Sequence, residues 1–270
     1  MKAKSWILLI LFFCLPLGRI LAGGISVDAG LTPAQNRWIM RMQYRYMEMH
    51  NSSMTTTSHM VPFVVAYGVT PKFTLMTRGM YVNKTNSMDH THKGGIGDVY
   101  LLSKFKLYRI NTPSYVFGIA PHIASNIPVG TVGISSRTWN PEVGINISYR
   151  PRFWAIDLSS SYTFSDLSGR SETNDNDIFE LNTAISVFFP FKNNTSSVLS
   201  PVLEFNYTHE VNYSDRVTTG PEILFISPGM SFIHSSLVLE GLIQFPVYQK
   251  TDNHLMNQKA KLILGIRYMF

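Results

Sequence analysis

Apolar and polar residues alternate with a period of two along most of the chain that follows residue 36. In the segment 38–46, Trp38 and Met40 occupy one set of alternate positions, whereas Arg41 and Arg45 occupy the other. Successive side chains of a β-strand point to opposite faces, so one face of this segment is apolar and the other is polar. The pattern therefore predicts a strand with one face in hydrocarbon and the other in water.

The same alternation recurs in further segments, and no segment after residue 36 shows the 3.6-residue period of an amphipathic helix. About twelve strands can be counted, an even number as in single-chain bacterial barrels. The sequence thus predicts an all-β fold, a single transmembrane antiparallel β-barrel over residues 36–270, with no internal repeat and no second domain. The expected strands lie at residues 38–46, 63–69, 72–78, 98–107, 115–126, 142–150, 154–164, 179–189, 199–208, 224–232, 237–245 and 259–270.

The connections between these segments alternate in length, which separates a membrane barrel from a soluble β-sandwich. Outer-membrane barrels have long extracellular loops and short periplasmic turns, so both termini are expected in the periplasm. A sandwich would also have to hide many strands with one aromatic face. The long polar connections are residues 50–59, 83–95, 128–138, 165–177, 210–220 and 248–258, and the short ones include 69–71, 110–112 and 150–152.

The N-terminus holds the only sustained apolar run, residues 6–17, which follows Lys2 and Lys4 and precedes small residues around Ala22. The run is too short to span a bilayer, so it predicts a signal peptide over residues 1–22, with a short membrane anchor as the alternative. Residues 23–35 show neither a strand nor a helix pattern. We expect them to form a lead-in that lies in the periplasm or inside the barrel lumen.

Composition agrees with a barrel and excludes other classes. The chain is 45% hydrophobic and 15% charged, too polar for a bundle of membrane helices and short of charge for a soluble enzyme. Removal of the signal peptide takes away three basic residues and no acidic one, so the net charge falls from +6 to +3. No basic cluster interleaved with aromatic residues exists, which argues against a nucleic-acid partner. Cys14 lies in the predicted signal peptide, so we expect no thiol in the mature chain.

Two groups of residues could carry chemistry, and neither pattern is complete. Residues 88–92 place two histidines and an aspartate in a predicted loop, but no third ligand can be recognised, so we predict no metal site and no cofactor. His122 is expected in the lumen, with Ser148, Ser159 and Ser161 as lumen hydroxyls. The Asn-Arg-Pro-His run of the outer-membrane phospholipase is absent, and a lone lumen histidine is more often a hydrogen-bonding group. We therefore predict no catalytic residue.

Charged residues at inward-facing positions form a set that is mixed in sign. The basic ones come mainly from the first four strands and the last, whereas the acidic ones come from strands six to eleven. This order predicts a cationic wall opposite an anionic wall, which would make an open pore weakly charge-selective. In a narrow lumen the two walls could instead pair and plug the barrel. The residues expected to line the lumen are Arg41, Arg45, Arg78, Lys104, Lys106, Glu180, Glu204, Glu240 and Arg267.

The last strand places Leu264, Ile266, Tyr268 and Phe270 on one face, so that the chain ends with an aromatic residue at the periplasmic interface. This ending resembles the signal that the barrel-assembly machinery reads, and Tyr268 and Phe270 are its expected residues. We therefore expect the cell outer membrane of a Gram-negative bacterium as the location, with outer-membrane lipid and the assembly machinery as partners.

Several segments resemble an outer-membrane transporter-like family named for the meta-pathway of phenol degradation. The run Gly-Gly-Ile-Gly-Asp at residues 94–98, which continues to Lys106, is similar to the glycine-aspartate strand start of that family. Tyr-Gly-Val-Thr-Pro-Lys-Phe at 67–73 is similar to its turn between the second and third strands. Ser-Pro-Gly-Met at 227–230 and Gln-Phe-Pro-Val-Tyr at 244–248 are similar to its late strands. The resemblance implies a role beside the catabolism of aromatic compounds and implies no catalytic residue.

These observations favour passive passage of a small solute through or partway through the barrel, with aromatic or other hydrophobic compounds as candidates. The alternative is a barrel that does not transport, either a lipid-modifying enzyme or a structural or metal-sensing surface protein. Single-channel conductance separates the two classes, since a plugged barrel or an enzyme should show none.

Overall fold

The structure, a computed structural model, describes residues 23–50, 54–87, 91–165, 177–191, 194–211, 220–251 and 257–270. No helix in this part of the chain is long and apolar enough to cross a membrane. The predicted signal peptide, over residues 1–22, and residues 88–90 of the predicted histidine-containing loop lie outside the described residues.

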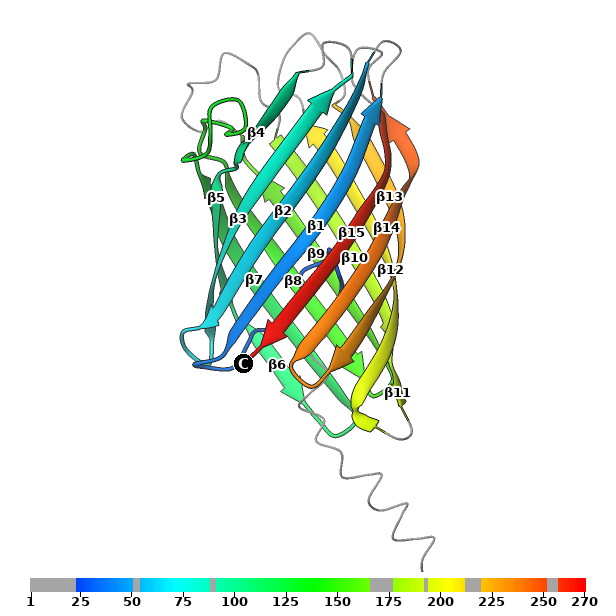
Figure 1. Ribbon diagram of the computed structural model, residues 1–270. Coiled ribbons are helices and arrows are strands. Elements are labelled where there is room, and N and C mark those ends of the chain that lie inside the picture. The colour runs from blue at the N-terminus through cyan, green and yellow to red at the C-terminus, as the bar shows by residue number, and fades with distance from the viewer. Residues whose placement is uncertain are drawn as a thin grey trace, which may run out of the picture.

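The described residues form one antiparallel sheet that curls into a closed barrel (Figure 1). Its strands are β1 (Trp38–His50), β2 (Thr55–Gly68), β3 (Phe73–Asn86), β4 (His92–Ile96), β5 (Val99–Phe105), β6 (Tyr108–Asn111), β7 (Tyr115–Ile127), β8 (Pro141–Pro151), β9 (Trp154–Thr163), β10 (Asp177–Val187), β11 (Phe189–Phe191), β12 (Asn194–Val211), β13 (Glu222–His234), β14 (Leu237–Lys250) and β15 (Asn257–Met269).

These elements make twelve strands of the barrel wall. β4, β5 and β6 follow one another along a single interrupted wall strand between β3 and β7, and β11 continues β10 along β12. β1 pairs with β15, and Trp38 and Phe270 exchange two backbone hydrogen bonds of 2.8 and 3.0 Å. The β1–β15 and β10–β12 pairings close the sheet on itself, so neither end of the strand order is left as an open edge. The predicted fold, a single closed antiparallel barrel, is confirmed.

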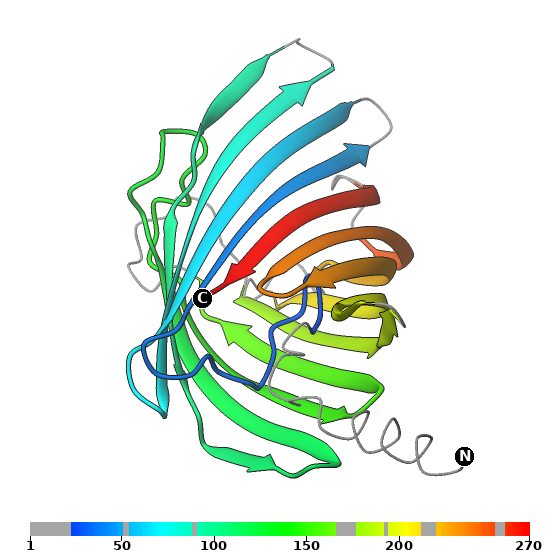
Figure 2. The same cartoon turned by 60° about the horizontal axis from the view of Figure 1, so that its bottom comes forward.

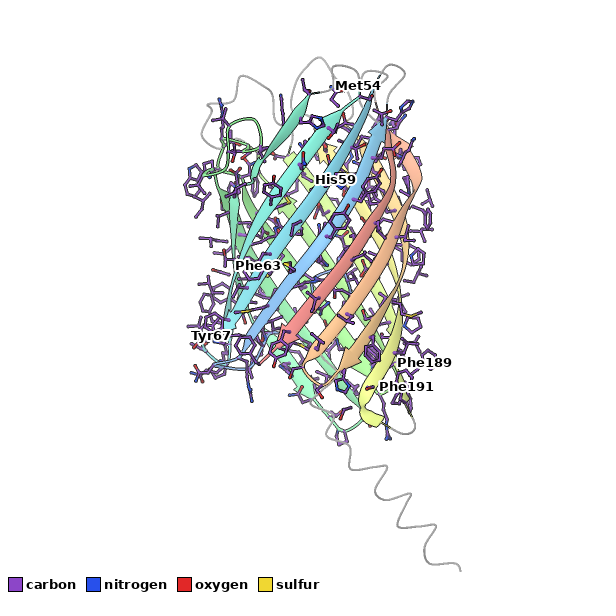
Figure 3. All side chains as sticks on the ribbon, in the orientation of Figure 1. Met54, His59, Phe63, Tyr67, Phe189 and Phe191 are labelled. Carbon is purple, nitrogen blue, oxygen red and sulfur yellow. The ribbon has the colours of Figure 1, made fainter. Side chains whose placement is uncertain are left out.

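The outer face is apolar and the inner face is polar, as the alternation predicts. On β1, Met42 is 50% exposed, whereas its neighbour Gln43 is 4% exposed inside the barrel. Phe63 and Leu264 are also exposed on the outside, and Figure 3 shows side chains such as Phe63 and Tyr67 projecting from the wall. A belt of this chemistry requires hydrocarbon around it, because exposed apolar surface of this extent is unfavourable in water.

The connections separate the two ends of the barrel. Short turns at residues 69–72, 112–114, 152–153 and 235–236 share one end with the C-terminus, whereas β1 ends and β2 begins at the opposite end (Figure 1). The bounds predicted for the first two long loops were wrong, because β2 already begins at Thr55 and β4 pairs with β3 from His92. These strand ends are polar on both faces, so no alternation marks them in the sequence.

The glycine-aspartate motif is a break inside a wall strand and not the start of one. β4 ends at Ile96 and β5 begins at Val99, while Gly97 N–H donates to the carbonyl of Met80 at 2.7 Å. Asp98 accepts hydrogen bonds from the backbone N–H groups of Gly130 and Ser136 at 3.1 and 2.9 Å. The motif therefore anchors the connection 128–140 at the rim.

Candidate functional site

The lumen contains a cavity of about 370 Å³. Side chains from β1, β2, β3, β5, β7, β8, β9, β10 and β15 line it, together with residues 23–33 of the chain. Its polar and charged lining residues are Ser26, Asp28, Thr32, Arg41, Gln43, Arg45, Thr74, Arg78, Tyr100, Lys104, His122, Glu142, Arg150, Ser159, Ser161, Thr163, Glu180, Asn182 and Arg267.

Residues 23–35, called the N-terminal segment below, enter the barrel. Figure 2 shows this segment in dark blue, crossing the opening at the end where the C-terminus lies and turning into the lumen. Ile25 is fully buried and belongs to an apolar cluster with Val27, Val202, Leu242 and Ile263. The sequence left open whether this segment lies in the periplasm or in the lumen, and in the structure it lies in the lumen.

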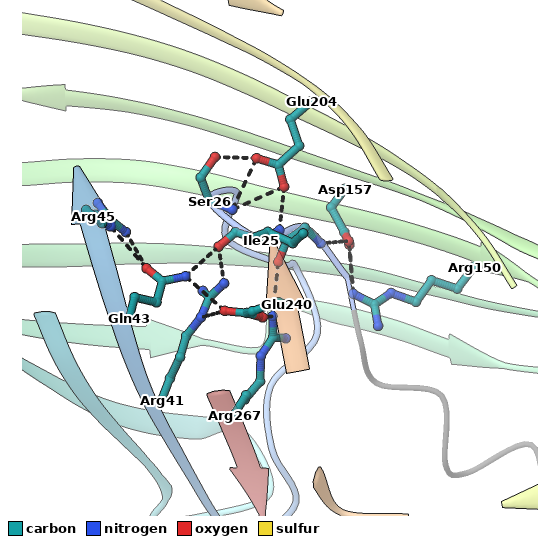
Figure 4. A network of polar contacts seen from close by, with 11 residues as sticks. Ile25, Ser26, Arg41, Gln43, Arg45, Arg150, Asp157, Glu204, Glu240 and Arg267 are labelled. Atoms are coloured by element: carbon teal, nitrogen blue, oxygen red, sulfur yellow. Dashed lines mark hydrogen bonds and ion pairs between the residues drawn. The ribbon is translucent and has the colours of Figure 1, made fainter. Parts of the chain in front are cut away.

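Glu204 on β12 holds the deepest part of the N-terminal segment. Its carboxylate accepts hydrogen bonds from the backbone N–H groups of Ile25 and Ser26 and from the Ser26 hydroxyl (Figure 4). Glu204 is fully buried. Among the described residues no ion pair is formed by Glu204, so hydrogen bonds from the segment satisfy its charge.

Glu240 on β14 lies between two cations from neighbouring strands. Arg41 Nε on β1 lies 2.5 Å from one carboxylate oxygen, and Arg267 on β15 donates to the other at 2.7 Å. The amide of Gln43 donates to the same carboxylate at 2.9 Å and to the carbonyl of Ile25 at 3.2 Å (Figure 4). This cluster thus ties three strands of the wall to the N-terminal segment.

Two more ion pairs lie along the N-terminal segment. Lys104 on β5 reaches Asp28 at 3.3 Å. Asp157 on β9 pairs with Arg150 on β8 at 3.0 Å and accepts a hydrogen bond from Gly24 N–H at 3.3 Å. A Cβ atom at Gly23 would clash with the ends of the Asp157 and Arg150 side chains, so a larger residue there would have to displace this ion pair. Together with the contact to Glu204 on β12, these pairs connect the segment to both sides of the lumen.

His122 on β7 is a hydrogen-bonding group within the wall. Its Nε2 lies 3.0 Å from Glu142, its Nδ1 lies 2.8 Å from the amide of Asn146, and Tyr100 donates to Glu142 at 2.9 Å. Both ring nitrogens are therefore occupied by groups other than a serine. Ser148, the nearest candidate hydroxyl by strand order, instead donates to Asp157.

The predicted lumen residues fall into three groups. Arg41, Arg45, Arg78, Lys104, Glu180 and Arg267 line the cavity. Glu204 and Glu240 face the lumen but are covered by the segment and by their partners. Lys106 follows the last residue of β5 and lies outside the cavity lining.

The predicted division into a cationic and an anionic wall needs correction for Glu240. β14 is the direct neighbour of β15, so Glu240 lies beside Arg267 and Arg41 and neutralises them locally. The prediction grouped Glu240 with the acidic residues of strands six to eleven, although its strand is the direct neighbour of the cationic last strand. Glu142 and Glu180, on β8 and β10, remain on the side away from β1 and β3.

Four polar residues of the site were not singled out from the sequence. Gln43 and Asn146 are neutral amides, and Tyr100 has an aromatic ring at an inward position. The alternation of their strands gives these three residues an inward register, but no sequence signal marks them as members of a hydrogen-bond network. Asp28 lies in the N-terminal segment, which has no periodic pattern, so no sequence signal places it beside Lys104.

The fold was compared with known proteins. No protein-family model matches the chain, and no curated protein matches it. An outer-membrane channel from Pseudomonas putida F1 superimposes with a TM-score of 0.63 and 14% identity, covering 92% of this chain and all of that chain. The fold is that of an outer-membrane β-barrel. The β-domain of a Bordetella autotransporter is similar to this barrel with a TM-score of 0.51 and 11% identity, covering 88% of this chain and 100% of that chain.

A KdgM porin, solved in complex with disordered oligogalacturonate, is similar to the barrel with a TM-score of 0.50 and 12% identity. The match covers 85% of this chain and 99% of that porin. Channels, porins and the barrel of an autotransporter therefore share this fold. The fold agrees with the predicted outer-membrane location, while the choice of solute depends on the lumen of each barrel.

Proposed function

We propose that the barrel is a channel that passes a small polar solute along its lumen. The observation that carries the proposal is the cavity of about 370 Å³ inside the wall, lined by charged and hydroxyl side chains from eight strands. A cavity of this size accommodates a small molecule. Similarity in fold to an outer-membrane channel and a porin supports the proposal at the level of architecture.

The N-terminal segment is the proposed constriction of this route. It occupies the lumen through the apolar contacts of Ile25 and the hydrogen bonds to Glu204, so a solute has to pass beside it or displace it. A narrow route of this kind favours small solutes and low conductance.

The aromatic or hydrophobic solute that the family resemblance implies stays a prediction. The cavity lining includes Arg45, Arg78, Lys104 and Glu180, and burial of an apolar solute against charged groups gains little. The lining therefore supports a polar solute as the cargo of the lumen. A role beside aromatic catabolism remains compatible with this proposal if the compound carries a polar or charged group.

Single-channel recording in planar bilayers tests the proposal. The purified, signal-peptide-free barrel should give discrete current steps in potassium chloride, and the same preparation unfolded by heat should give none. A barrel that is folded, as judged by its heat-modifiable migration on a gel, and gives no steps would contradict a channel.

A further inference from the structure

Three lumen cations stand apart from the ion pairs described above. They are Arg45 on β1, Arg78 on β3 and Lys261 on β15, and these strands lie together in the order β3, β2, β1, β15. Within the described ranges, no carboxylate lies within 4.0 Å of any of the three. Other lumen cations, such as Lys104, have such a partner.

Each of the three is held by a neutral group. Two nitrogens of the Arg45 guanidinium donate to the Gln43 side-chain oxygen at 3.1 and 2.7 Å. Arg78 lies over the ring of Tyr100, 4.4 Å from its centroid. Lys261 Nζ lies 4.2 Å from the ring centroid of Phe225. A cation on an aromatic face keeps N–H groups that point away from the ring, so hydrogen-bond donors remain for a ligand.

The cluster carries an excess of positive charge. Arg45 and Arg78 line the same cavity, and Lys261 lies on β15 two positions from Ile263, the register partner of Arg45. Glu180 is the carboxylate that faces Arg78 and Lys261, without forming an ion pair with either. The neighbouring Glu142 is engaged by His122 and Tyr100 (3.0 and 2.9 Å). Glu240 and Glu204 also attract Arg45, but Glu240 pairs with Arg41 and Arg267 and Glu204 accepts hydrogen bonds from the N-terminal segment. The repulsion that remains among the three cations favours an anion from solution.

We propose that Arg45, Arg78 and Lys261 form a binding site for a small organic carboxylate on its way through the lumen. This inference rests on the proposed channel function, and it narrows the solute to an anion. The planar fork of arginine matches the two oxygens of a carboxylate, and two arginines and a lysine on one wall provide more donors than a single carboxylate needs. Arg45 and Arg78 line the cavity, so the site is open to its contents.

Binding is tested with two probes that have the same length but different charge. Glutarate and its uncharged diamide, glutaramide, are added to the purified barrel in detergent, and ligand-observed saturation-transfer NMR measures binding. Glutarate should bind and glutaramide should not. Inorganic phosphate is the competing anion, and tighter binding of phosphate than of glutarate would overturn the carboxylate assignment in favour of a phosphate site.

Four variants locate the site. The single variant Arg78→Gln should weaken glutarate binding by roughly tenfold or more, and so should the double variant Arg45→Gln/Arg78→Gln. Each charge-assisted hydrogen bond contributes on that scale. Glu180→Gln should strengthen it, because it removes the carboxylate that acts on Arg78 and Lys261. Lys259→Gln is the matched control, since Lys259 lies two residues from Lys261 and pairs with Glu48 at 2.5 Å. Equal affinity in all four variants, or no glutarate binding to the unchanged barrel, would overturn the site.

Conductance of the same preparations separates this inference from the proposed function. A barrel that conducts without binding glutarate would refute the carboxylate site and leave the channel intact. A barrel that binds glutarate at these residues without conducting would refute the channel and leave the site as a lumen binding site.

Discussion

The carboxylate of Glu204 accepts a hydrogen bond of 3.1 Å from the backbone N–H group of Ser26, although the two residues are 178 positions apart in the sequence. This contact joins the middle of β12 to the N-terminal segment and places a buried acid where the segment turns (Figure 4). Glu204→Ala should free the segment, because buried N–H groups left without a partner cost about 1–3 kcal/mol each. We expect larger and more variable single-channel conductance.

The control for this change is Glu48→Ala, which removes a carboxylate whose partner Lys259 lies at the rim. If both variants conduct like the unchanged barrel, Glu204 does not hold the constriction.

The cations Arg45 and Lys104 should respond differently to charge reversal. Arg45→Glu places a carboxylate in the cavity wall and should shift the reversal potential toward cation selectivity. Lys104→Glu should in addition loosen the N-terminal segment, because it faces Asp28 at the position of the present 3.3 Å ion pair. The double variant should combine both effects. An unchanged reversal potential in a conducting Arg45→Glu barrel would show that Arg45 lies off the ion path.

The orientation of the barrel predicts which loops are extracellular. Ser87 is exposed at the end of β3, on the side away from both described chain ends, and a cysteine there should react with an impermeant maleimide on whole cells. Ser114→Cys, at the opposite end, should react only after lysis. The reverse pattern would invert the topology. Ser171, in the other loop predicted to be extracellular, lies outside the described residues.

Asp98 makes the connection 128–140 sensitive to acid. Burial raises its pKa, but hydrogen bonds from Ser135 and Ser136 outweigh burial and hold the pKa below its ordinary value. Asp98 therefore anchors the connection fully above about pH 4, the pKa of a free aspartate. The anchoring is lost as the pH falls through the lower pKa that Asp98 has in the folded protein. A spin label at Val132, which is 77% exposed, should become more mobile in this acid range. The Asp98→Asn variant should show no such pH dependence.

Phe270 combines two roles that a substitution can separate. Its backbone closes the barrel on Trp38, and its ring lies 5.5 Å from that of Tyr268 on the outer face. Phe270→Ala keeps the backbone hydrogen bonds and removes the ring. We expect less protein in the outer membrane and more degradation in the periplasm, because the assembly machinery is proposed to read the terminal aromatic residue. Loss of the ring costs about 1.5–3 kcal/mol of burial, so inserted molecules should keep normal heat-modifiable migration. If the amount of protein in the outer membrane is unchanged, Phe270 acts only as an anchor at the membrane interface.

Alternation along the chain was sufficient to predict the wall of the barrel. Met42 and Gln43 are adjacent in sequence and lie on opposite faces of β1. Neighbouring residues lie on opposite faces of every strand that has one side in lipid, so no tertiary information is needed to tell inward from outward residues. The closed fold follows because each strand in lipid must find a neighbour on both sides, and the count of strands came from the number of alternating segments. Strand ends beyond the hydrocarbon, such as residues 55–58, were missed since neither face there is selected for lipid.

Tertiary structure alone decided which charges meet. Glu240 lies beside Arg41 and Arg267 because closure brings β1 next to β15, a relationship between residues 199 and 27 positions apart. The N-terminal segment shows no periodicity, and its place depends on contacts with Glu204 and Lys104, which belong to distant strands. Such pairings depend on strand register and on the shape of the enclosed space, and neither is encoded by the local pattern of residues.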